Sequence, residues 1–289
     1  MRPYHFWYVY FGDGSSGLLL DFVKFPDRAY TRAAVFTPRG HRVVESVPVP
    51  LSELRVASWD GALPIRLGDS SLDCYRVVGA TGPVRYDLSL AIGGPSVSFT
   101  PRAAAVLADV PRVTSRLDVR FTGTVSVDGQ VLRYENVRGA YAYYWIRDLT
   151  RVPWRIVSAL NGDRFALEFA IARALGGWHA TGYLRFDGDE FRFEGFRGSR
   201  RVSIEERGDP DADGRTYAFT ATRGSRRFRV EAHASSDRFV TLHRGPDVLI
   251  HTTLLGSCMV TVSRRHRSGD WRHEASALAR DNCLLETKD

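Results

Sequence analysis

The chain has 289 residues, of which 44% are hydrophobic and 25% are charged, and its formal net charge is +7. These fractions are those of an ordinary globular protein and exclude a disordered or collagen-like chain. No run of about 18 apolar residues is present to span a membrane as a helix, and the first residues lack the pattern of a secretory signal peptide. We therefore expect a globular protein of the cytoplasm.

Arginine supplies almost all of the positive charge, because the only lysines are Lys24 and Lys288. Two interpretations stay open: a solvated strand surface, or a surface that makes peripheral contact with an anionic membrane. Nucleic acid is the less favoured partner, since no recognition helix, RNP-like motif or zinc-finger spacing accompanies the arginines. The clusters are Arg197, Arg200 and Arg201; Arg223, Arg226, Arg227 and Arg229; and Arg264, Arg265 and Arg267. The scarcity of asparagine and glutamine fits a thermophile or a GC-rich genome.

The three cysteines are Cys74, Cys258 and Cys283, and they show neither CxxC nor Cys/His metal spacing. We favour reduced thiols, with a disulfide between Cys258 and Cys283 as the alternative. The chain also lacks a P-loop, a dinucleotide fingerprint and a serine nucleophile elbow. No cofactor and no metal are therefore expected.

The first predicted elements are an aromatic strand at 5–11 and an apolar strand at 18–25, joined by a glycine-rich loop. Residues 48–73 are the least regular region and either cross a barrel mouth or lead to the next sheet. The segment Thr100–Asp109 is the one helix-like stretch, with Thr100 as N-cap and a proline at the first helical position.

Period-2 patterning dominates the second part of the chain as well. Asp128–Gly129 predicts a two-residue hairpin turn, because both residues accept the positive φ of a type I′ turn. A second aromatic strand follows at 141–145, and Gly188 predicts another hairpin. Strand following strand, with turns between, indicates an all-β antiparallel meander. Since each half opens on an aromatic strand, we place a domain boundary near residues 151–153.

The midpoint block, with the aromatic strands and the two-half β layout, resembles the hydroxyneurosporene synthase superfamily. That superfamily includes carotenoid 1,2-hydratase and the AttH-like tandem lipocalin proteins; tocopherol cyclase and the fungal lipocalin-like Diels-Alderases are similar in architecture. Residues 139–146 read Gly-Ala-Tyr-Ala-Tyr-Tyr-Trp-Ile, where the family reads Gly-Tyr-His-Asp-His-Asn-Trp-Gly. Gly139 and Trp145 match, whereas the family's two histidines fall on Tyr141 and Tyr143, its aspartate on Ala142 and its asparagine on Tyr144.

This resemblance implies two lipocalin-like (calycin) β-barrels or sandwiches in tandem, over residues 1–152 and 153–289, with at most a short helix. It implies an apolar isoprenoid or polyketide-like ligand in a cavity, and its hydration or cyclisation by acid and cation-stabilising chemistry. Trp145 would stabilise a cation through its ring face, while another residue would have to donate the proton. A non-catalytic lipid carrier with a basic membrane-docking surface is the alternative function.

The candidate residues follow from this hypothesis. Glu168 is a lone acid in an apolar strand, suited to general-acid chemistry if it faces a cavity, but alternation also allows it to face outward. Asp21 has the same two interpretations, and His179 is either an acid or base or a structural histidine. His5, beside Trp7, has the same two interpretations as His179, and its place near the terminus favours a structural histidine. The expected catalytic residues are Tyr143, Trp145, Glu168 and His179, and the expected ligand-binding residues are Trp7, Tyr141, Trp154 and Trp178.

Overall fold

The computed structural model describes residues 4–58, 63–93, 96–98, 112–146, 153–174, 177–193, 202–207, 214–243 and 248–288. Within these ranges the regular structure is β-strand apart from two single-turn 3₁₀ helices, η1 (Leu51–Glu53) and η2 (Ser236–Arg238). The predicted all-β class is therefore confirmed. The helix expected at Thr100–Asp109 and the boundary residues 151 and 152 lie outside the described residues. None of the helices in the described part is long and apolar enough to cross a membrane.

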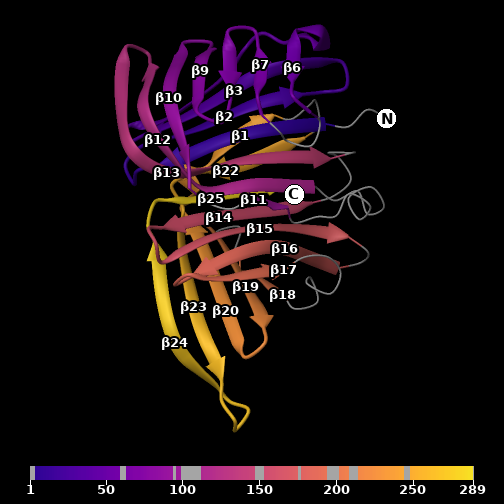
Figure 1. The fold of residues 1–289 in the computed structure, drawn as a ribbon, viewed down its shortest axis with the longest axis vertical. Coiled ribbons are helices and arrows are strands. Elements are labelled where there is room, and N and C mark those ends of the chain that lie inside the picture. The colour runs from indigo at the N-terminus through magenta and orange to yellow at the C-terminus, as the bar shows by residue number, and fades with distance from the viewer. Residues whose placement is uncertain are drawn as a thin grey trace. The chain divides into compact units, whose positions relative to one another are not determined.

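The chain divides into two compact units, of which the first holds β1 to β13 and the second β14 to β25 (Figure 1). The strands of the first unit are β1 (Tyr4–Gly12), β2 (Gly17–Lys24), β3 (Arg28–Thr37), β4 (Gly40–Glu45), β5 (Val49–Pro50), β6 (Leu54–Val56), β7 (Ile65–Leu67), β8 (Ser70–Leu72), β9 (Arg76–Thr81), β10 (Val84–Ile92), β11 (Ser96–Ser98), β12 (Arg112–Val127) and β13 (Gln130–Ile146).

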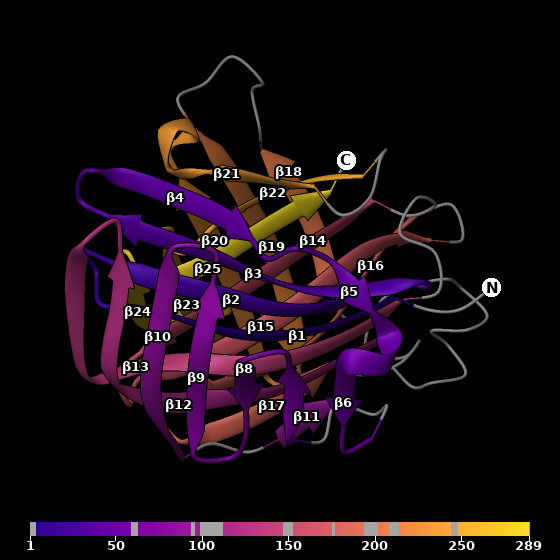
Figure 2. The same cartoon turned by 90° about the horizontal axis from the view of Figure 1, so that it is seen from above.

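The first unit is one curled antiparallel sheet, in the order β4-β3-β2-β1-β13-β12-β10-β9-β8-β7-β6. Its strands β9 and β10 run across β1 to β3 (Figure 2). The Thr81 hydroxyl, at the end of β9, donates a hydrogen bond to the Thr31 hydroxyl of β3 over 2.9 Å. This contact fixes one side of the curled sheet against the other, and the apolar core lies in the space between them.

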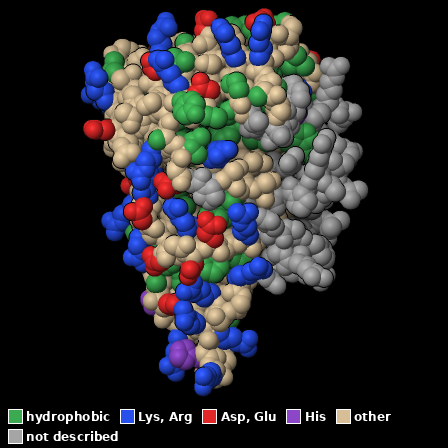
Figure 3. All heavy atoms as spheres, in the orientation of Figure 1, with side chains coloured by type: hydrophobic (Ala, Val, Ile, Leu, Met, Phe, Trp, Pro, Cys, Tyr) green, Lys and Arg blue, Asp and Glu red, His purple; other side chains and the backbone are tan. Residues whose placement is uncertain are grey.

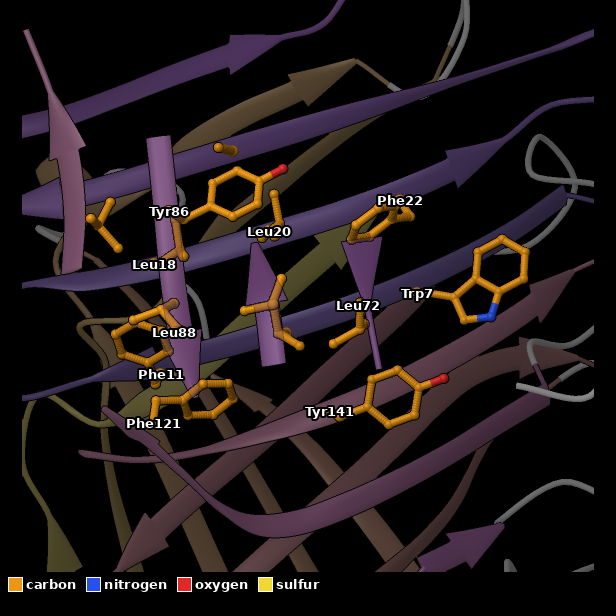
Figure 4. Close-up of a cluster of buried hydrophobic side chains, with 14 of the residues drawn as sticks. Trp7, Phe11, Leu18, Leu20, Phe22, Leu72, Tyr86, Leu88, Phe121 and Tyr141 are labelled. Carbon is orange, nitrogen blue, oxygen red and sulfur yellow. The ribbon is translucent and has the colours of Figure 1, made fainter. Parts of the chain in front are cut away.

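Figure 4 shows the core of the first unit. Alternation along β1 and β2 turns every second side chain inward, which explains why two neighbouring strands supply so much of the apolar cluster. Trp7 and Tyr141 lie towards one end of the cluster, and Phe11 and Phe121 lie towards the other. The rings of Phe11 and Phe121 stack with centroids 4.7 Å apart.

The second unit contains two antiparallel sheets. The larger has the order β17-β16-β15-β14-β25-β22-β21, and the smaller has the order β18-β19-β20-β23-β24. Phenylalanines join them, since Phe169 of the larger sheet lies 4.5 Å from Phe219 of the smaller sheet, centroid to centroid. The strands are β14 (Trp154–Asn161), β15 (Phe165–Ala174), β16 (Gly177–Phe186), β17 (Asp189–Phe193), β18 (Val202–Arg207), β19 (Arg215–Arg223), β20 (Arg226–Ala234), β21 (Val240–His243), β22 (Leu249–Thr253), β23 (Ser257–Arg265), β24 (Trp271–Ala279) and β25 (Cys283–Lys288).

Both predicted hairpins are confirmed. Asp128 and Gly129 have φ of 49° and 81° and join β12 to β13, whose end residues Val127 and Gln130 face each other. Asp187 and Gly188 have φ of 48° and 89° and join β16 to β17 in the same way. Two positive φ angles in succession are those of a type I′ turn.

Each unit also pairs its first strand with its last. In the first unit β1 is antiparallel to β13, with Tyr4 opposite Ile146. In the second unit β14 is antiparallel to β25, with Trp154 opposite Lys288. These two ladders join parts of the chain that are more than a hundred residues apart, so they depend on the tertiary fold and not on local turns.

Candidate functional site

The candidate site is a group of side chains inside the first unit, where β1 begins and β13 ends. It consists of His5, Trp7, Lys24, Tyr141, Tyr143 and Trp145, and we call it the His5–Tyr143 cluster. The register places His5 opposite Trp145, and Trp7 opposite Tyr143. Lys24 enters from β2, where it lies opposite His5. Three adjacent strands therefore deliver one histidine, one lysine and four aromatic residues to the same end of the sheet.

A hydrogen bond between two buried side chains forms the centre of this cluster. His5 Nδ1 lies 2.8 Å from the Tyr143 hydroxyl, and the imidazole tautomer decides which of the two donates. The His5 ring stacks on Trp7 with centroids 5.7 Å apart, and Trp7 lies 5.4 Å from the Tyr143 ring. Trp7 and Tyr143 are fully buried. A polar pair thus lies buried among apolar ring surfaces.

The electrostatics of the cluster keep His5 neutral. Burial of the imidazole, and secondly the positive charge of Lys24, lower the pKa of His5 from 6.5 to about 3. A neutral imidazole donates a hydrogen bond with one nitrogen and accepts one with the other, so at neutral pH His5 can orient a hydroxyl but cannot supply a proton as a cation. Lys24 adds positive charge to a largely apolar site.

Gly139 explains how β1 and β13 approach each other closely enough to build this cluster. A β-carbon at position 139 would lie only 2.1 Å from the Tyr10 backbone oxygen and 2.5 Å from the Phe11 β-carbon. Any other residue would force the strands apart where the aromatic segment of β13 starts. The glycine that the sequence shares with the superfamily block therefore has a packing function here.

A second polar group in the same interior is structural. The Tyr86 hydroxyl lies 2.7 Å from the Ser70 hydroxyl and 3.3 Å from the Thr81 hydroxyl, which itself bonds to Thr31. The network joins four neutral hydroxyls and the Ala80 backbone oxygen, to which the Ser70 hydroxyl donates over 3.0 Å, so it stabilises the curled sheet. It also provides a matched comparison for Tyr143.

The structure brings four of the expected site residues together: Trp7, Tyr141, Tyr143 and Trp145 all belong to the His5–Tyr143 cluster or pack against its core. Trp154 and Glu168 belong to the second unit. Their strands are neighbours, but Trp154 pairs with Ala172 while Glu168 pairs with Ser158. Four residues of offset separate them by about 13 Å along the strands, so they form no common site.

Glu168 lies on the sheet face opposite Phe169, as alternation predicts, and yet it is fully buried.

Trp154 donates its indole N–H to Glu286 Oε1 over 3.2 Å, and Lys288 Nζ lies 5.5 Å from the Trp154 ring centroid. Trp178 and His179 lie on β16, but their side chains are outside the described residues, so their expected roles stay predictions.

Asp21 pairs with a cation within the first unit. Arg32 Nε donates to Asp21 Oδ2 over 2.9 Å, and both residues are at most 1% exposed. Since Leu20 and Phe22 face the core, Asp21 lies on the other face of β2 and away from the His5–Tyr143 cluster. This ion pair makes Asp21 a structural residue.

Sequence reasoning overlooked Lys24 and interpreted His5 as structural. The signal for Lys24 was present, because alternation in 18–25 places it on the same face as Leu20 and Phe22. A lone lysine on an apolar face, in a chain with only two lysines, is a functional indication.

Among the residues that the structure describes, no group of three or more His, Cys, Asp or Glu side chains is arranged to hold a metal ion.

No protein-family model matches the chain, and no curated protein matches its sequence. Three solved structures are similar over nearly its full length. An AttH-like protein from Nitrosomonas europaea shares 13% identity, with 99% of this chain and 91% of that chain covered and a TM-score of 0.63. Kievitone hydratase from Nectria haematococca shares 9%, covering 98% and 88%, with a TM-score of 0.56. CghA shares 12%, covering 99% and 87%, with a TM-score of 0.59.

These similarities establish the fold. The expected tandem lipocalin-like architecture is confirmed, and one protein of the same fold is a hydratase. At such low identity the fold does not carry an activity with it. The narrower resemblance to carotenoid 1,2-hydratase stays a prediction.

Proposed function

We propose that the first unit binds an apolar, isoprenoid- or polyketide-like molecule against Trp7, Tyr141 and Trp145, and that the His5–Tyr143 pair promotes its cyclisation or hydration. The observation that carries the proposal is the 2.8 Å contact between His5 Nδ1 and the Tyr143 hydroxyl in an apolar, aromatic environment. Such a polar point in an apolar site orients a ligand and acts on one functional group of it.

The charges of the site favour one chemistry over the other. With Nδ1–H of neutral His5 donating to the Tyr143 oxygen, the Tyr143 O–H is directed to a ligand oxygen, where it polarises a carbonyl or enol. Lys24 favours negative charge developing on that oxygen and disfavours a carbocation nearby. Cyclisation or hydration of a carbonyl-conjugated double bond therefore suits the site better than protonation of an isolated isoprenoid double bond.

The similarity to kievitone hydratase supports a catalytic function for the fold, although the reaction of that protein is not carried over to this chain. Trp145, which the resemblance assigned to cation stabilisation, instead contributes apolar surface in this proposal. Glu168 has no role in it.

The test compares Tyr143→Phe with Tyr86→Phe, because both substitutions remove one buried hydroxyl from the interior of the same unit. The probes are a diene tethered to an enone, for cyclisation, and a prenylated phenol, for hydration of an isolated double bond. Ligand retention is followed by native mass spectrometry and turnover by chromatography. We expect Tyr143→Phe to keep binding but to lower turnover of the enone about 10²-fold or more, and Tyr86→Phe to leave turnover unchanged.

Equal losses of turnover in both variants would contradict the proposal. The loss would then come from disturbing the buried interior and not from removing the Tyr143 hydroxyl in particular. Retention of apolar molecules by the wild type without turnover of either probe would identify the alternative, a lipid or isoprenoid carrier. Preferential turnover of the prenylated phenol would refute the assignment of carbonyl activation.

A further inference from the structure

The arginine clusters, which the proposed function does not use, meet in one row across the smaller sheet of the second unit. Arg223 of β19 lies opposite Arg226 of β20. Arg226 in turn lies opposite Arg264 of β23, and Arg264 opposite Arg272 of β24. Like charges directly opposite each other on neighbouring strands are destabilising. Four arginines in succession therefore require compensating negative charge.

The described residues supply carboxylates to part of this row. Arg226 forms an ion pair with Asp189 and lies 3.5 Å from Glu274, measured from Nε to Oε2. Arg264 Nη2 lies 2.8 Å from Glu274 Oε1. Two carboxylates thus serve the two inner arginines of the row. The outer two, Arg223 and Arg272, are exposed.

More positive charge surrounds the row. Arg265 and Arg267 are exposed at the turn between β23 and β24. Arg227 lies with its guanidinium carbon 4.1 Å from the centroid of the partly buried Trp271 ring. We call residues 223–227 and 263–274 the arginine end of the second unit. It contains seven arginines and two carboxylates, so its excess of positive charge belongs to one end of one sheet.

The space-filling view agrees with this distribution. In Figure 3, Lys and Arg side chains gather with a histidine at the lower end of the second unit, and few acidic side chains are seen there. Figure 1 shows that the same end is built from the ends of β20, β23 and β24. The positive charge therefore sits on the projecting tips of hairpins.

We propose that the arginine end docks the protein on an anionic lipid bilayer, with its arginines on lipid phosphates and Trp271 in the headgroup region. Arginine pairs with phosphate through two parallel hydrogen bonds, and tryptophan prefers the membrane interface. Proteins that follow a single-stranded nucleic acid use a positively charged groove lined by several aromatic side chains. Here one tryptophan stands among arginines at hairpin tips, which suits a flat anionic surface better.

This docking is independent of the chemistry proposed for the first unit. It also gives that unit a source of ligand, because a bilayer dissolves apolar molecules. Each arginine near an anionic membrane changes binding by about fivefold, and the effect weakens as salt screens the surface. Reversal of three arginines is therefore expected to weaken binding by at least about 100-fold.

The test measures co-sedimentation with vesicles of phosphatidylcholine, with and without phosphatidylserine. One variant reverses three exposed residues of the arginine end, Arg265→Glu, Arg267→Glu and Arg272→Glu. The control reverses three exposed arginines of the first unit by the same net charge, Arg66→Glu, Arg85→Glu and Arg133→Glu. We expect the wild type and the control to bind phosphatidylserine vesicles, the first variant to lose binding at least about 100-fold, and none to bind phosphatidylcholine alone.

Potassium chloride titration of the wild type tests the same inference without any substitution, and binding should fall as the salt concentration rises. The inference is overturned if the wild type does not bind phosphatidylserine vesicles, if both triple variants lose binding equally, or if a single-stranded oligonucleotide binds in place of the vesicles. Ligand retention and turnover, measured without vesicles, report on the first unit separately, so the two proposals fail independently.

Discussion

Acidification is expected to destabilise the first unit through His5. The folded protein holds this imidazole neutral, with its pKa lowered by burial and by Lys24 to about 3. The unfolded chain exposes the same side chain, whose pKa then returns to 6.5. Between these two values the unfolded state binds a proton that the folded state does not. The free energy of unfolding therefore falls as the pH is lowered through this window, and His5 no longer opposes folding above pH 6.5.

The size of the effect follows from the pKa difference. Each pH unit inside the window lowers the free energy of unfolding by up to about 1.4 kcal/mol. Between pH 7.5 and pH 4.5 the contribution of His5 amounts to about 3 kcal/mol. The free energy of unfolding of a folded domain is typically about 5–15 kcal/mol. The pH-dependent contribution of His5 is therefore a large part of the total.

Urea unfolding at the two pH values measures this contribution, with His5→Gln compared against the wild type. The substitution also weakens the contact with Tyr143, but that cost is present at both pH values and cancels in the difference. His41→Gln, at an exposed position of β4 in the same unit, is the control. We expect the pH-dependent loss to shrink by about 2–3 kcal/mol in His5→Gln and to remain unchanged in His41→Gln.

Two results would refute this reasoning. One is an unchanged pH dependence in His5→Gln. The other is an imidazole NMR resonance of His5 that titrates near pH 6.5 in the folded protein, which would mean that neither burial nor Lys24 perturbs it.

Three further predictions concern the packing of the chain. Gly139→Ala should lower the free energy of unfolding by about 3 kcal/mol, because the added β-carbon would overlap β1. Gly93→Ala, whose added β-carbon would lie 3.4 Å from its nearest neighbour, should lower it by less than about 1 kcal/mol, and equal costs in urea unfolding would contradict the close approach. Arg32→Met should lower the free energy of unfolding by about 3–5 kcal/mol, because it leaves the buried Asp21 carboxylate without its guanidinium partner, and adding Asp21→Leu should recover most of that loss. Strictly additive losses in urea unfolding would show that the two side chains are not coupled. In the folded protein a water-soluble disulfide reagent should modify Cys74 alone, since Cys258 and Cys283 are buried and burial raises the pKa of the Cys283 thiol. Fast reaction of all three thiols would contradict this packing.

The hairpins could be predicted from the sequence because their determinants are local. Asp128–Gly129 and Asp187–Gly188 carry the positive φ of their turns within two residues, and no distant contact is needed to choose them. The pairing of β1 with β13 has no such local signal. It depends on which of many aromatic strands pack together, a choice made by the tertiary fold.

The candidate site could be predicted in part for the same reason. Alternation correctly placed Tyr141, Tyr143 and Trp145 on one face, and for Glu168 it allowed the face away from the core, where the structure places this residue. Alternation defines the side of a strand but not what covers that side, so it could not reveal that Glu168 is buried. The contact between His5 and Tyr143 joins residues 138 positions apart, which no local pattern encodes.

The pairing of first strand with last has a consequence for how such a chain can be rearranged. Because Tyr4 lies opposite Ile146, and Trp154 opposite Lys288, the two ends of each unit lie on adjacent strands. A segment whose ends meet can be duplicated, transplanted into a loop of another protein, or rejoined end to end and opened elsewhere without stretching the connection. Circular permutants that join such ends and open the chain at Asp128–Gly129 or Asp187–Gly188 should therefore keep both ladders.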